Sequence, residues 1–393
     1  MTTAYLDHIA ATPLHPEALK AMMPYLQGVF GNPQSLHSAG QRAAAAVEEA
    51  RGEVAALVGA GPEEIYFSSS GSEANNFAIK GLALANQAKG KHIVVSAVEH
   101  LSVLNSVKAL EKSGFTSTLV PVDGAGLVDP RDVEKALRQD TILVSVMTAN
   151  GEVGTVEPIS EVGAICRAHG VLLHTDAVAA AGNIPLDVGE LGVSALSLAG
   201  DQFYGPKGSA ALFVKKGTRI LPLIEGGVQE NGRRAGTENV PGIVGLGKAA
   251  SLASAEMDSR RAQLQPLRDR LLEELPRRVD HVVVTGHLMR RLPHHASFCV
   301  AFVEGEGMLL GLDLQGFAAS SGSACTSKAL KASHVLLAMG MDHALAQGSL
   351  VFSLIDGTGR PDIERLLDVF PPVVERLRKM SPLYTQFLKE KRQ

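Results

Sequence analysis

The chain has 393 residues, of which 45% are hydrophobic and 20% charged, a composition typical of a globular protein with more than one domain. Its formal net charge is −4, its basic residues form no cluster and no run is apolar for long enough to span a bilayer, so neither nucleic acid nor a membrane is expected as a partner. Three widely separated cysteines indicate neither a disulfide framework nor a zinc site, and they favour a reducing cytoplasm.

Short β-rich runs alternate with helical patterns from about residue 64 to residue 215. Continuous apolar strands that alternate with helices predict an α/β fold, with a mostly parallel seven-stranded sheet covered by helices on both faces. We expect its ligand site at the carboxyl ends of the strands. The predicted strands are residues 64–67, 92–97, 116–121, 141–147, 171–175, 195–199 and 209–214, and the predicted helices include residues 72–88, 101–113, 130–139 and 159–169.

A long helical pattern at residues 241–275 predicts a bridge out of this sheet domain. Strand patterns at residues 281–284 and 297–303 follow it, with helical patterns at residues 306–314 and 362–379. This order predicts a smaller α+β domain. We therefore expect a large domain at residues 15–250 and a small domain formed by residues 1–14 and 251–393.

Two polar motifs follow predicted strands. Residues 68–76, Ser-Ser-Ser-Gly-Ser-Glu-Ala-Asn-Asn, open a predicted helix, so backbone N–H groups of this segment could bind a phosphate. The same residues also suit an ordinary helix cap. Asp176 ends the strand at residues 171–175, where its carboxylate could hold a pyridine nitrogen protonated or could cap a helix.

Two further motifs carry a family resemblance. Residues 203–208, Phe-Tyr-Gly-Pro-Lys-Gly, and residues 320–327, Ser-Ser-Gly-Ser-Ala-Cys-Thr-Ser, resemble cysteine desulfurases of the NifS and IscS type. The likeness extends over nearly the whole chain, from residues 5–13 to residues 381–383. It implies membership of the class-V aminotransferases, the fold-type I architecture of pyridoxal-phosphate (PLP) transferases, and a homodimer.

The resemblance also implies roles for single residues. His100 matches the histidine that stacks on the PLP ring, Asn150 matches the asparagine beside the ring, and Asp176 matches the partner of the ring nitrogen. Gly71 and Ser72 match the phosphate loop. In the same family, a threonine in the position of Thr237 contributes to the phosphate site of the other subunit.

Cys325 matches the family's persulfide carrier, which lies on a loop and takes sulfur from cysteine. Its Ser-, Thr- and Gly-rich surroundings favour an exposed thiol. Cys166 and Cys299 lie within apolar patterns instead, and we expect both to be buried and inert.

The departures from the family pattern gather at the cofactor site. Gln202 stands where the family has the lysine that forms an imine with PLP, and a carboxamide nitrogen cannot form an imine. Asp201 and Ala199 replace a histidine and a serine that help to hold the phosphate, and Ala179 replaces a glutamine. Val351 replaces the arginine that binds the carboxylate of the substrate.

We therefore expect a homologue that has lost PLP-dependent desulfuration, with PLP only as its ancestral cofactor and no metal. It would serve in persulfide transfer or iron–sulfur cluster assembly through Cys325, docking an iron–sulfur scaffold or sulfur-acceptor protein. Two alternatives stay open. One is an active PLP-dependent desulfurase or lyase with PLP held noncovalently or by another lysine. Lys207 is not expected to be that lysine, because it lies five residues beyond Gln202, after a rigid Gly-Pro step. The other is a new chemistry with Asp201 or His100 as acid or base.

Overall fold

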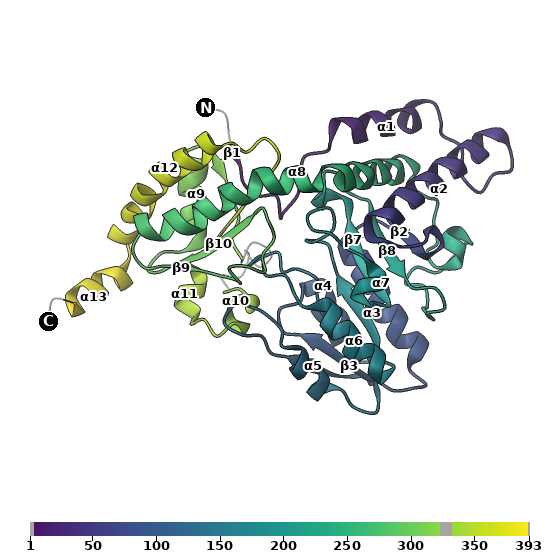
Figure 1. Ribbon diagram of the computed structural model, residues 1–393, viewed down its shortest axis with the longest axis horizontal. Helices are drawn as coiled ribbons and strands as arrows, with labels where there is room; N and C mark the ends of the chain where they lie inside the picture. Colours follow the sequence, from purple (N-terminus) through teal and green to yellow (C-terminus); the bar gives the residue numbers. More distant parts are fainter. Residues whose placement is uncertain (1–3, 323–331, 392–393) are drawn as a thin grey trace.

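The computed structural model describes residues 4–322 and 332–391 (Figure 1). A sheet of seven strands lies in the larger part of the molecule, in the order β2-β8-β7-β6-β5-β3-β4. Strands from β7 to β4 are parallel to their neighbours, whereas β8 is antiparallel to β2 and β7, so the predicted mostly parallel sheet is confirmed. Its strands are β2 (Ile65–Ser68), β3 (His92–Ser96), β4 (Thr116–Val120), β5 (Thr141–Ser145), β6 (Leu172–Asp176), β7 (Ala195–Ala199) and β8 (Ala210–Val214).

Both faces of this sheet are buried under helices. In β3, Val94 lies in one apolar core, whereas its neighbours Ile93 and Val95 lie in another on the opposite face. A strand buried on both sides requires apolar side chains at successive positions, which explains its continuous apolar run. The first core includes residues of α2 (Ser38–Val58), α5 (Pro130–Ala136), α6 (Ile159–His169) and α7 (Val188–Leu191), and the second includes residues of α3 (Gly71–Asn86) and α4 (Leu101–Glu111).

The helix α8 (Val240–Arg278) crosses from this part of the molecule to the other (Figure 1). Its first half buries Ile243 and Leu246 in the core shared with α2, and its second half buries Leu264 and Leu271 in a separate core. The helix α1 (Pro16–Gln27) packs against α8 as well. The long helical pattern at residues 241–275 thus forms the predicted bridge.

The separate core belongs to a smaller α+β assembly. An antiparallel sheet in the order β12-β10-β9 packs with α9 (Gly305–Asp313) and α12 (Arg360–Lys379). Leu6 joins this core from the N-terminal segment. The division into residues 15–250 and residues 1–14 with 251–393 stays a prediction. The remaining elements are β1 (Ala4–Tyr5), β9 (Val282–Val284), β10 (His295–Val300), β11 (Phe317–Ala318), β12 (Ser349–Ser353), α10 (His334–Ala338), α11 (His343–Gln347) and α13 (Pro382–Glu390).

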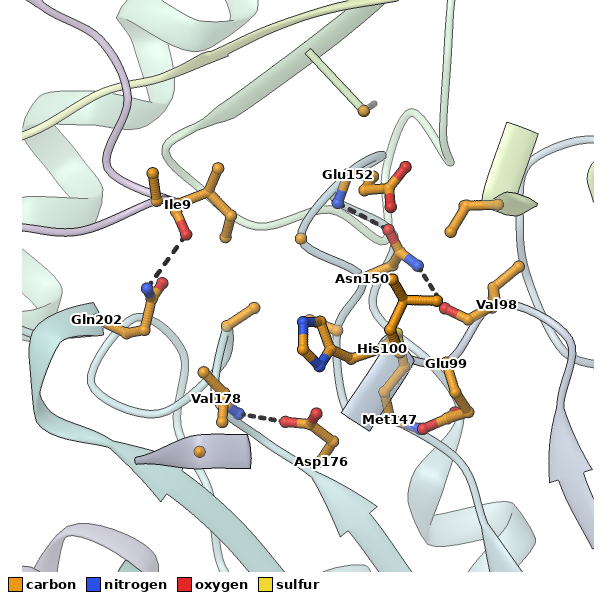
Figure 2. Close-up of a pocket in the computed structure, with 18 of the residues that line it drawn as sticks. Ile9, Val98, Glu99, His100, Met147, Asn150, Glu152, Asp176, Val178 and Gln202 are labelled. Atoms are coloured by element: carbon orange, nitrogen blue, oxygen red, sulfur yellow. Dashed lines mark hydrogen bonds between the residues drawn. The ribbon is translucent and has the colours of Figure 1, made fainter. Parts of the chain in front are cut away.

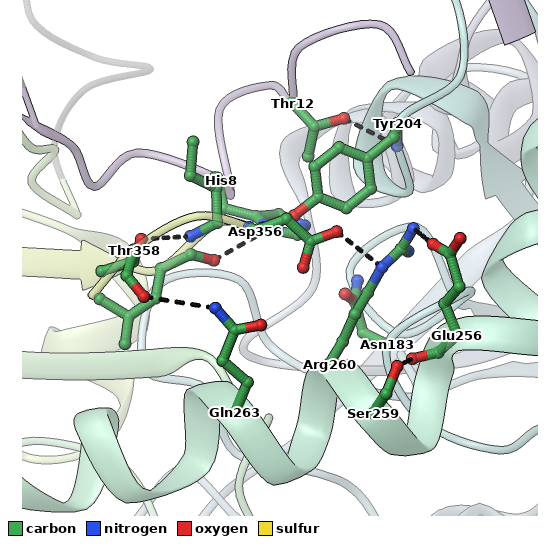
Figure 3. Close-up of polar contacts among 12 residues, drawn as sticks. His8, Thr12, Asn183, Tyr204, Glu256, Ser259, Arg260, Gln263, Asp356 and Thr358 are labelled. Atoms are coloured by element: carbon green, nitrogen blue, oxygen red, sulfur yellow. Dashed lines mark hydrogen bonds and ion pairs between the residues drawn. The ribbon is translucent and has the colours of Figure 1, made fainter. Parts of the chain in front are cut away.

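Polar contacts hold α8 against the turn that follows β7 (Figure 3). The Arg260 guanidinium lies 4.5 Å from the centroid of the Tyr204 ring and pairs with Asp356, with 2.9 Å between Nε and Oδ2. The Asp356 backbone N–H donates to the Tyr204 hydroxyl (2.8 Å), and the Tyr204 N–H donates to Thr12 (2.8 Å). Tyr204 has a left-handed φ of 66°, which costs free energy for a residue with a β-carbon, and these contacts offset that cost.

Across the described residues, 4–322 and 332–391, no helix is long and apolar enough to cross a membrane. The helix α2 and the strand β12 are among the regular elements that were not predicted from the sequence. The helix α2 packs against the large sheet, and β12 carries Val351.

Candidate functional site

A cavity of about 510 Å³ lies at the carboxyl ends of the parallel strands, where a ligand site was expected (Figure 2). Residues after β3, β5 and β7, the end of β6 and the start of α3 line it. Its volume suits a small organic ligand. The predicted site residues that meet in its lining are Gly71, Ser72, His100, Asn150, Asp176, Asp201 and Gln202.

Asp176 is the last residue of β6, and its carboxyl group is fixed on both oxygens. Oδ1 accepts a hydrogen bond from the Val178 backbone N–H (2.9 Å), and Oδ2 accepts one from the Asn75 side chain (2.6 Å). Burial raises the pKa of Asp176, and these bonds oppose the rise. A carboxyl held in this way can bind a protonated ring nitrogen without moving.

His100 follows β3 and caps the N-terminus of α4. Its Nδ1 accepts from the Ser102 backbone N–H (3.1 Å) and lies 2.7 Å from the Ser102 hydroxyl, so the cap orients the ring. The ring stands near the centre of the cavity, close to Asp176 (Figure 2). His100 therefore caps a helix and also lines the cavity.

Asn150 stabilises the loop after β5 with its whole amide group. Its Nδ2 donates to the Val98 carbonyl (2.9 Å), and its Oδ1 accepts from the backbone N–H groups of Glu152 (2.8 Å) and Val153 (3.1 Å). Since both polar atoms of the amide are bonded to backbone groups, the Asn150 side chain can offer a ligand in the cavity only van der Waals contact with the face of its amide plane.

Gln202 ends the 3₁₀ turn η2 (Gly200–Gln202) directly after β7. Its Nε2 donates to the Ile9 carbonyl (3.1 Å), and its backbone carbonyl lies 2.9 Å from His8 Nε2. The side chain is buried, and its Oε1 has no hydrogen-bond partner among the described residues. The N-terminal segment thus holds the Gln202 amide at the cavity wall.

The N-terminus of α3 forms another part of the wall. Ser70 caps it by accepting from the Glu73 backbone N–H (3.1 Å). Glu73 lies in the first turn, where it accepts from the Ser69 N–H (2.9 Å) and pairs with Arg234 (2.9 Å). A helix N-terminus favours negative charge, and here a protein carboxylate already occupies the first turn beside Gly71.

Carboxyl groups dominate the charge of the cavity. Four of them line it, and neither lysine nor arginine does so among the described residues. Burial raises the pKa of each, for Glu152 to about 7 and for Glu99 well above its usual range. The four residues are Glu99, Glu152, Asp176 and Asp201.

Glu99 and Glu152 were not predicted as site residues. Each stands beside one that was, in Glu99-His100 and in Asn150-Gly-Glu152, and this adjacency was the only available signal. Glu99 Oε1 accepts from the Met147 backbone N–H (2.7 Å), and the Ser333 hydroxyl donates to Glu152.

The other departures from the family pattern also lie in this cavity. Ala179, Ala199 and Val351 all line it and offer no polar atoms from their side chains. Lys207 does not belong to the lining; it borders a different pocket with Tyr5 and Thr12. No described side chain in the cavity can therefore supply an amine.

Two predicted residues are not part of the described cavity. Thr237 is exposed, and its predicted contribution to another subunit stays a prediction. Cys325 lies outside the described residues, although Gly322 before its segment and Ser333 after it both line the cavity. Cys166 and Cys299 are buried, as expected, and burial raises the pKa of each thiol to about 12.

The described lining fits the parts of PLP unequally. Asp176 and His100 suit the ring, because one offers a fixed carboxyl group and the other a ring face. No lysine stands in the described lining to take the aldehyde, and no described lining cation neutralises the phosphate. The described residues of this chain therefore do not fit covalently bound PLP. Among residues 4–322 and 332–391, no three His, Cys, Asp or Glu side chains form a group that could hold a metal ion.

The family model described as aminotransferase class-V matches residues 4–366. The chain is 50% identical over 378 residues to the cysteine desulfurase IscS of Dictyoglomus turgidum, with 96% of each protein covered, and 47% identical over 379 residues to the cysteine desulfurase IscS of Methanosarcina thermophila, with 96% of this chain and 94% of that one covered. A solved structure described as a NifS-like protein matches with a TM-score of 0.90 and 33% identity, over 96% of this chain and 100% of its own. The chain thus belongs to the class-V aminotransferase family, among the cysteine desulfurases of the NifS and IscS type.

Proposed function

We propose that this chain is a cysteine desulfurase homologue that has lost PLP-dependent desulfuration and serves in persulfide transfer or iron–sulfur cluster assembly. The observation that carries the proposal is the cavity wall at Gln202, where an amide bonded to the Ile9 carbonyl takes the position that the family resemblance gives to lysine. PLP, when bound in this family, acts as an electron sink for the substrate amine. An amide can neither tether the aldehyde nor transfer the substrate proton.

The surroundings of Gln202 support the same proposal. Asp201 adds a carboxyl group to the cavity, and Val351 offers no donor to a substrate carboxylate. If Asp201 lay about 4 Å from a bound phosphate, each pair of like charges would cost about 4 kcal/mol at an effective dielectric constant near 20. Both substitutions therefore disfavour the anionic cofactor and the anionic substrate.

Cys325 is the proposed sulfur carrier. Its thiolate would attack the terminal sulfur of a donor persulfide, the S–S bond of the donor would break, and the donor thiolate would leave and take up a proton. No net oxidation occurs in this exchange, because the terminal sulfur moves from one thiolate to another. Gly322 and Ser333, described residues on either side of the Cys325 segment, both line the cavity.

The proposed partners are a second copy of the chain and an iron–sulfur scaffold or sulfur-acceptor protein in the cytoplasm. The exposed position of Thr237 is compatible with a contribution to a second subunit. The buried Cys166 and Cys299 cannot meet a partner protein, which leaves Cys325 as the thiol to test.

One observation favours a second candidate function. His100, Asn150 and Asp176 meet in the cavity with the polar atoms of Asp176 and Asn150 already fixed. This arrangement would suit an active desulfurase or lyase that holds PLP noncovalently.

A persulfidation assay separates the two. Reduced protein is incubated with glutathione persulfide, and the sulfur added to each cysteine is located by mass spectrometry of peptides, before and after addition of an iron–sulfur scaffold protein. The proposal expects one added sulfur at Cys325, its transfer to the scaffold, and no such product in the Cys325→Ser variant. The buried Cys299 serves as the internal control. Release of alanine from cysteine by the protein supplied with PLP would instead establish the second candidate.

A further inference from the structure

Two side chains, those of Asn75 and Ser102, connect Asp176 to His100 through hydrogen bonds. Asn75 Nδ2 lies 2.6 Å from Asp176 Oδ2 and 2.9 Å from Ser102 Oγ. Ser102 Oγ in turn lies 2.7 Å from His100 Nδ1. Because Asn75 belongs to α3 and Ser102 to α4, these bonds join two helices to the end of β6.

Each bond of this chain has a definite direction. An ionised Asp176 can only accept, so the Asn75 amide must turn its NH2 group toward the carboxylate. Both hydrogens of that group are then used, one on Asp176 and the other on Ser102 Oγ. The Ser102 hydroxyl therefore accepts from Asn75, and its own hydrogen can point to His100 Nδ1.

The backbone of α4 imposes the same state on His100 independently. The Ser102 backbone N–H donates to His100 Nδ1 (3.1 Å), and a backbone N–H cannot accept. Nδ1 therefore carries a lone pair and no hydrogen. A neutral imidazole has a hydrogen on only one of its two nitrogens, so in His100 that hydrogen lies on Nε2.

The Nε2–H group of His100 is directed to the cavity. Both hydrogen bonds that the His100 ring forms with described residues end on Nδ1, which leaves Nε2 for a ligand. The side chain is exposed, and it lines the cavity near Asp176 (Figure 2). A neutral imidazole with a fixed Nε2–H can polarise an acceptor atom of a ligand, but it cannot take a proton through that nitrogen.

We propose that Asn75 and Ser102 are positioning residues that hold His100 as a neutral hydrogen-bond donor in the cavity. The ligand then presents an acceptor to Nε2–H, such as a carbonyl oxygen or the sulfur of a thiolate, and His100 does not serve as a general base. This inference goes beyond the proposed function, because the same donor would face a persulfide or a noncovalently held cofactor.

Nuclear magnetic resonance can locate the hydrogen directly. The full chain is labelled with ¹⁵N at histidine, and long-range ¹H–¹⁵N couplings at mildly alkaline pH distinguish a protonated ring nitrogen from an unprotonated one. The His100 signals are identified by their loss in His100→Gln. We expect a protonated Nε2 and an unprotonated Nδ1 in the parent chain, and a hydrogen on Nδ1 would overturn the inference.

Variants of Ser102 test what fixes this tautomer. Ser102→Pro removes both donors to Nδ1 in the first turn of α4, where proline is tolerated. The hydrogen should then exchange between the two nitrogens of His100, so their chemical shifts should move toward each other. If this variant does not fold, Ser102→Ala removes one donor and should move the shifts in the same direction by a smaller amount.

Ser106→Ala is the matched control. Ser106 is a buried serine of the same helix, and its hydroxyl donates to the Ser102 carbonyl (2.7 Å) rather than to His100. Its loss should leave the His100 shifts unchanged. Shifts that move as far in Ser106→Ala as in Ser102→Pro would contradict a positioning role of Ser102.

Diethyl pyrocarbonate provides a chemical readout, because it acylates an unprotonated ring nitrogen. In the parent chain Nδ1 of His100 is occupied and Nε2 carries the hydrogen, so His100 should react more slowly than the exposed His343, as followed by mass spectrometry of peptides. Ser102→Pro should raise the His100 rate about tenfold, as the loss of two hydrogen bonds predicts. Equal His100 rates in the two proteins would overturn the inference, whereas the persulfidation assay tests the proposed function separately.

Discussion

The two walls of the cavity differ in how their side chains are held. The first wall, formed at the ends of β3, β5 and β6, consists of Glu99, His100, Asn150 and Asp176. The second wall, formed by the end of β7, the turn after it and strand β12, consists of Ala199, Asp201, Gln202 and Val351. Backbone N–H groups bond to every side chain of the first wall, whereas Ala199 and Val351 of the second contribute no polar side-chain atoms at all.

The side chains of the first wall stabilise the fold, whereas those of the second wall matter mainly for the chemistry of the cavity. Side chains of the first wall cap a helix and close a loop, so replacing them would leave backbone groups without partners. Positions such as Ala199 and Val351 lie within buried strands and pack well as apolar residues. The second wall can therefore lose the polar groups that would hold PLP and its substrate without destabilising the fold. The first wall keeps its polar side chains because backbone groups depend on them.

The largest expected effect comes from Gln202→Lys, which restores an amine to the second wall. An unpaired ammonium at this buried position should lower the free energy of unfolding by about 3 kcal/mol at neutral pH, measured by urea denaturation. Addition of PLP should recover part of this loss and give a visible absorption band that borohydride removes.

The matched control is Gln202→Met, which has similar size and no amine. It should show neither the absorption band nor stabilisation by PLP. A PLP band of equal strength in the Met variant or in the parent chain would mean that the second wall does not control cofactor attachment.

A smaller effect is expected from Arg260→Ala, which removes a support of the second wall. Arg260 contacts the Tyr204 ring and pairs with Asp356, and Tyr204 follows Gln202 by two positions. Losing the ion pair and the ring contact should lower the free energy of unfolding by about 2 kcal/mol. The exposed neighbour Arg261→Ala should change it by no more than about 0.5 kcal/mol, and equal losses in the two variants would contradict this role of Arg260.

The first wall should respond to pH through Glu152. Burial raises its pKa to about 7 from the usual 4.5 of a glutamate, so between these two pH values the folded chain holds a proton that the unfolded chain has released. Its contribution to stability is therefore fully present below about pH 4.5 and is lost as the pH rises toward 7. Glu152→Gln should raise the melting temperature relative to the parent chain at pH 8 more than at pH 5.

Glu161→Gln, at an exposed position of α6, is the control for this pH dependence. Its melting temperature should follow that of the parent chain across the same range. If Glu152→Gln also followed the parent chain at every pH, Glu152 would not be the buried titrating group.

The large sheet was predictable because its strands are buried on both faces and so carry continuous apolar runs. The helix α2 was missed although its signal was present, since Ala43, Val47, Ala50, Val54 and Val58 recur at helical spacing and are buried. The strand β12 is a different case. It has five residues and forms by pairing with β10, about 50 positions earlier in the sequence, so no local pattern specified it.

The site was predictable in position but not in charge. Strand ends indicated where Asp176 and His100 would meet, and the structure places both in one cavity. Glu99 and Glu152 were missed because an acidic residue after a strand is usually solvated, and only tertiary packing buries these two. The acidic character of the cavity is thus a property of the folded chain that no single motif expressed.

Lys207→Ala should have the smallest effect, and it tests whether the second wall has a substitute amine. Lys207 is exposed and borders the pocket of Tyr5 and Thr12 rather than the cavity, although its charge opposes the rise that burial causes in the pKa of Asp201. Its removal should change the free energy of unfolding by no more than about 0.5 kcal/mol and leave any PLP band of the Gln202→Lys protein intact. Two results would show that Lys207 anchors the cofactor. One is loss of the PLP band when Lys207→Ala is added to the Gln202→Lys protein. The other is a PLP band in the parent chain that Lys207→Ala alone removes.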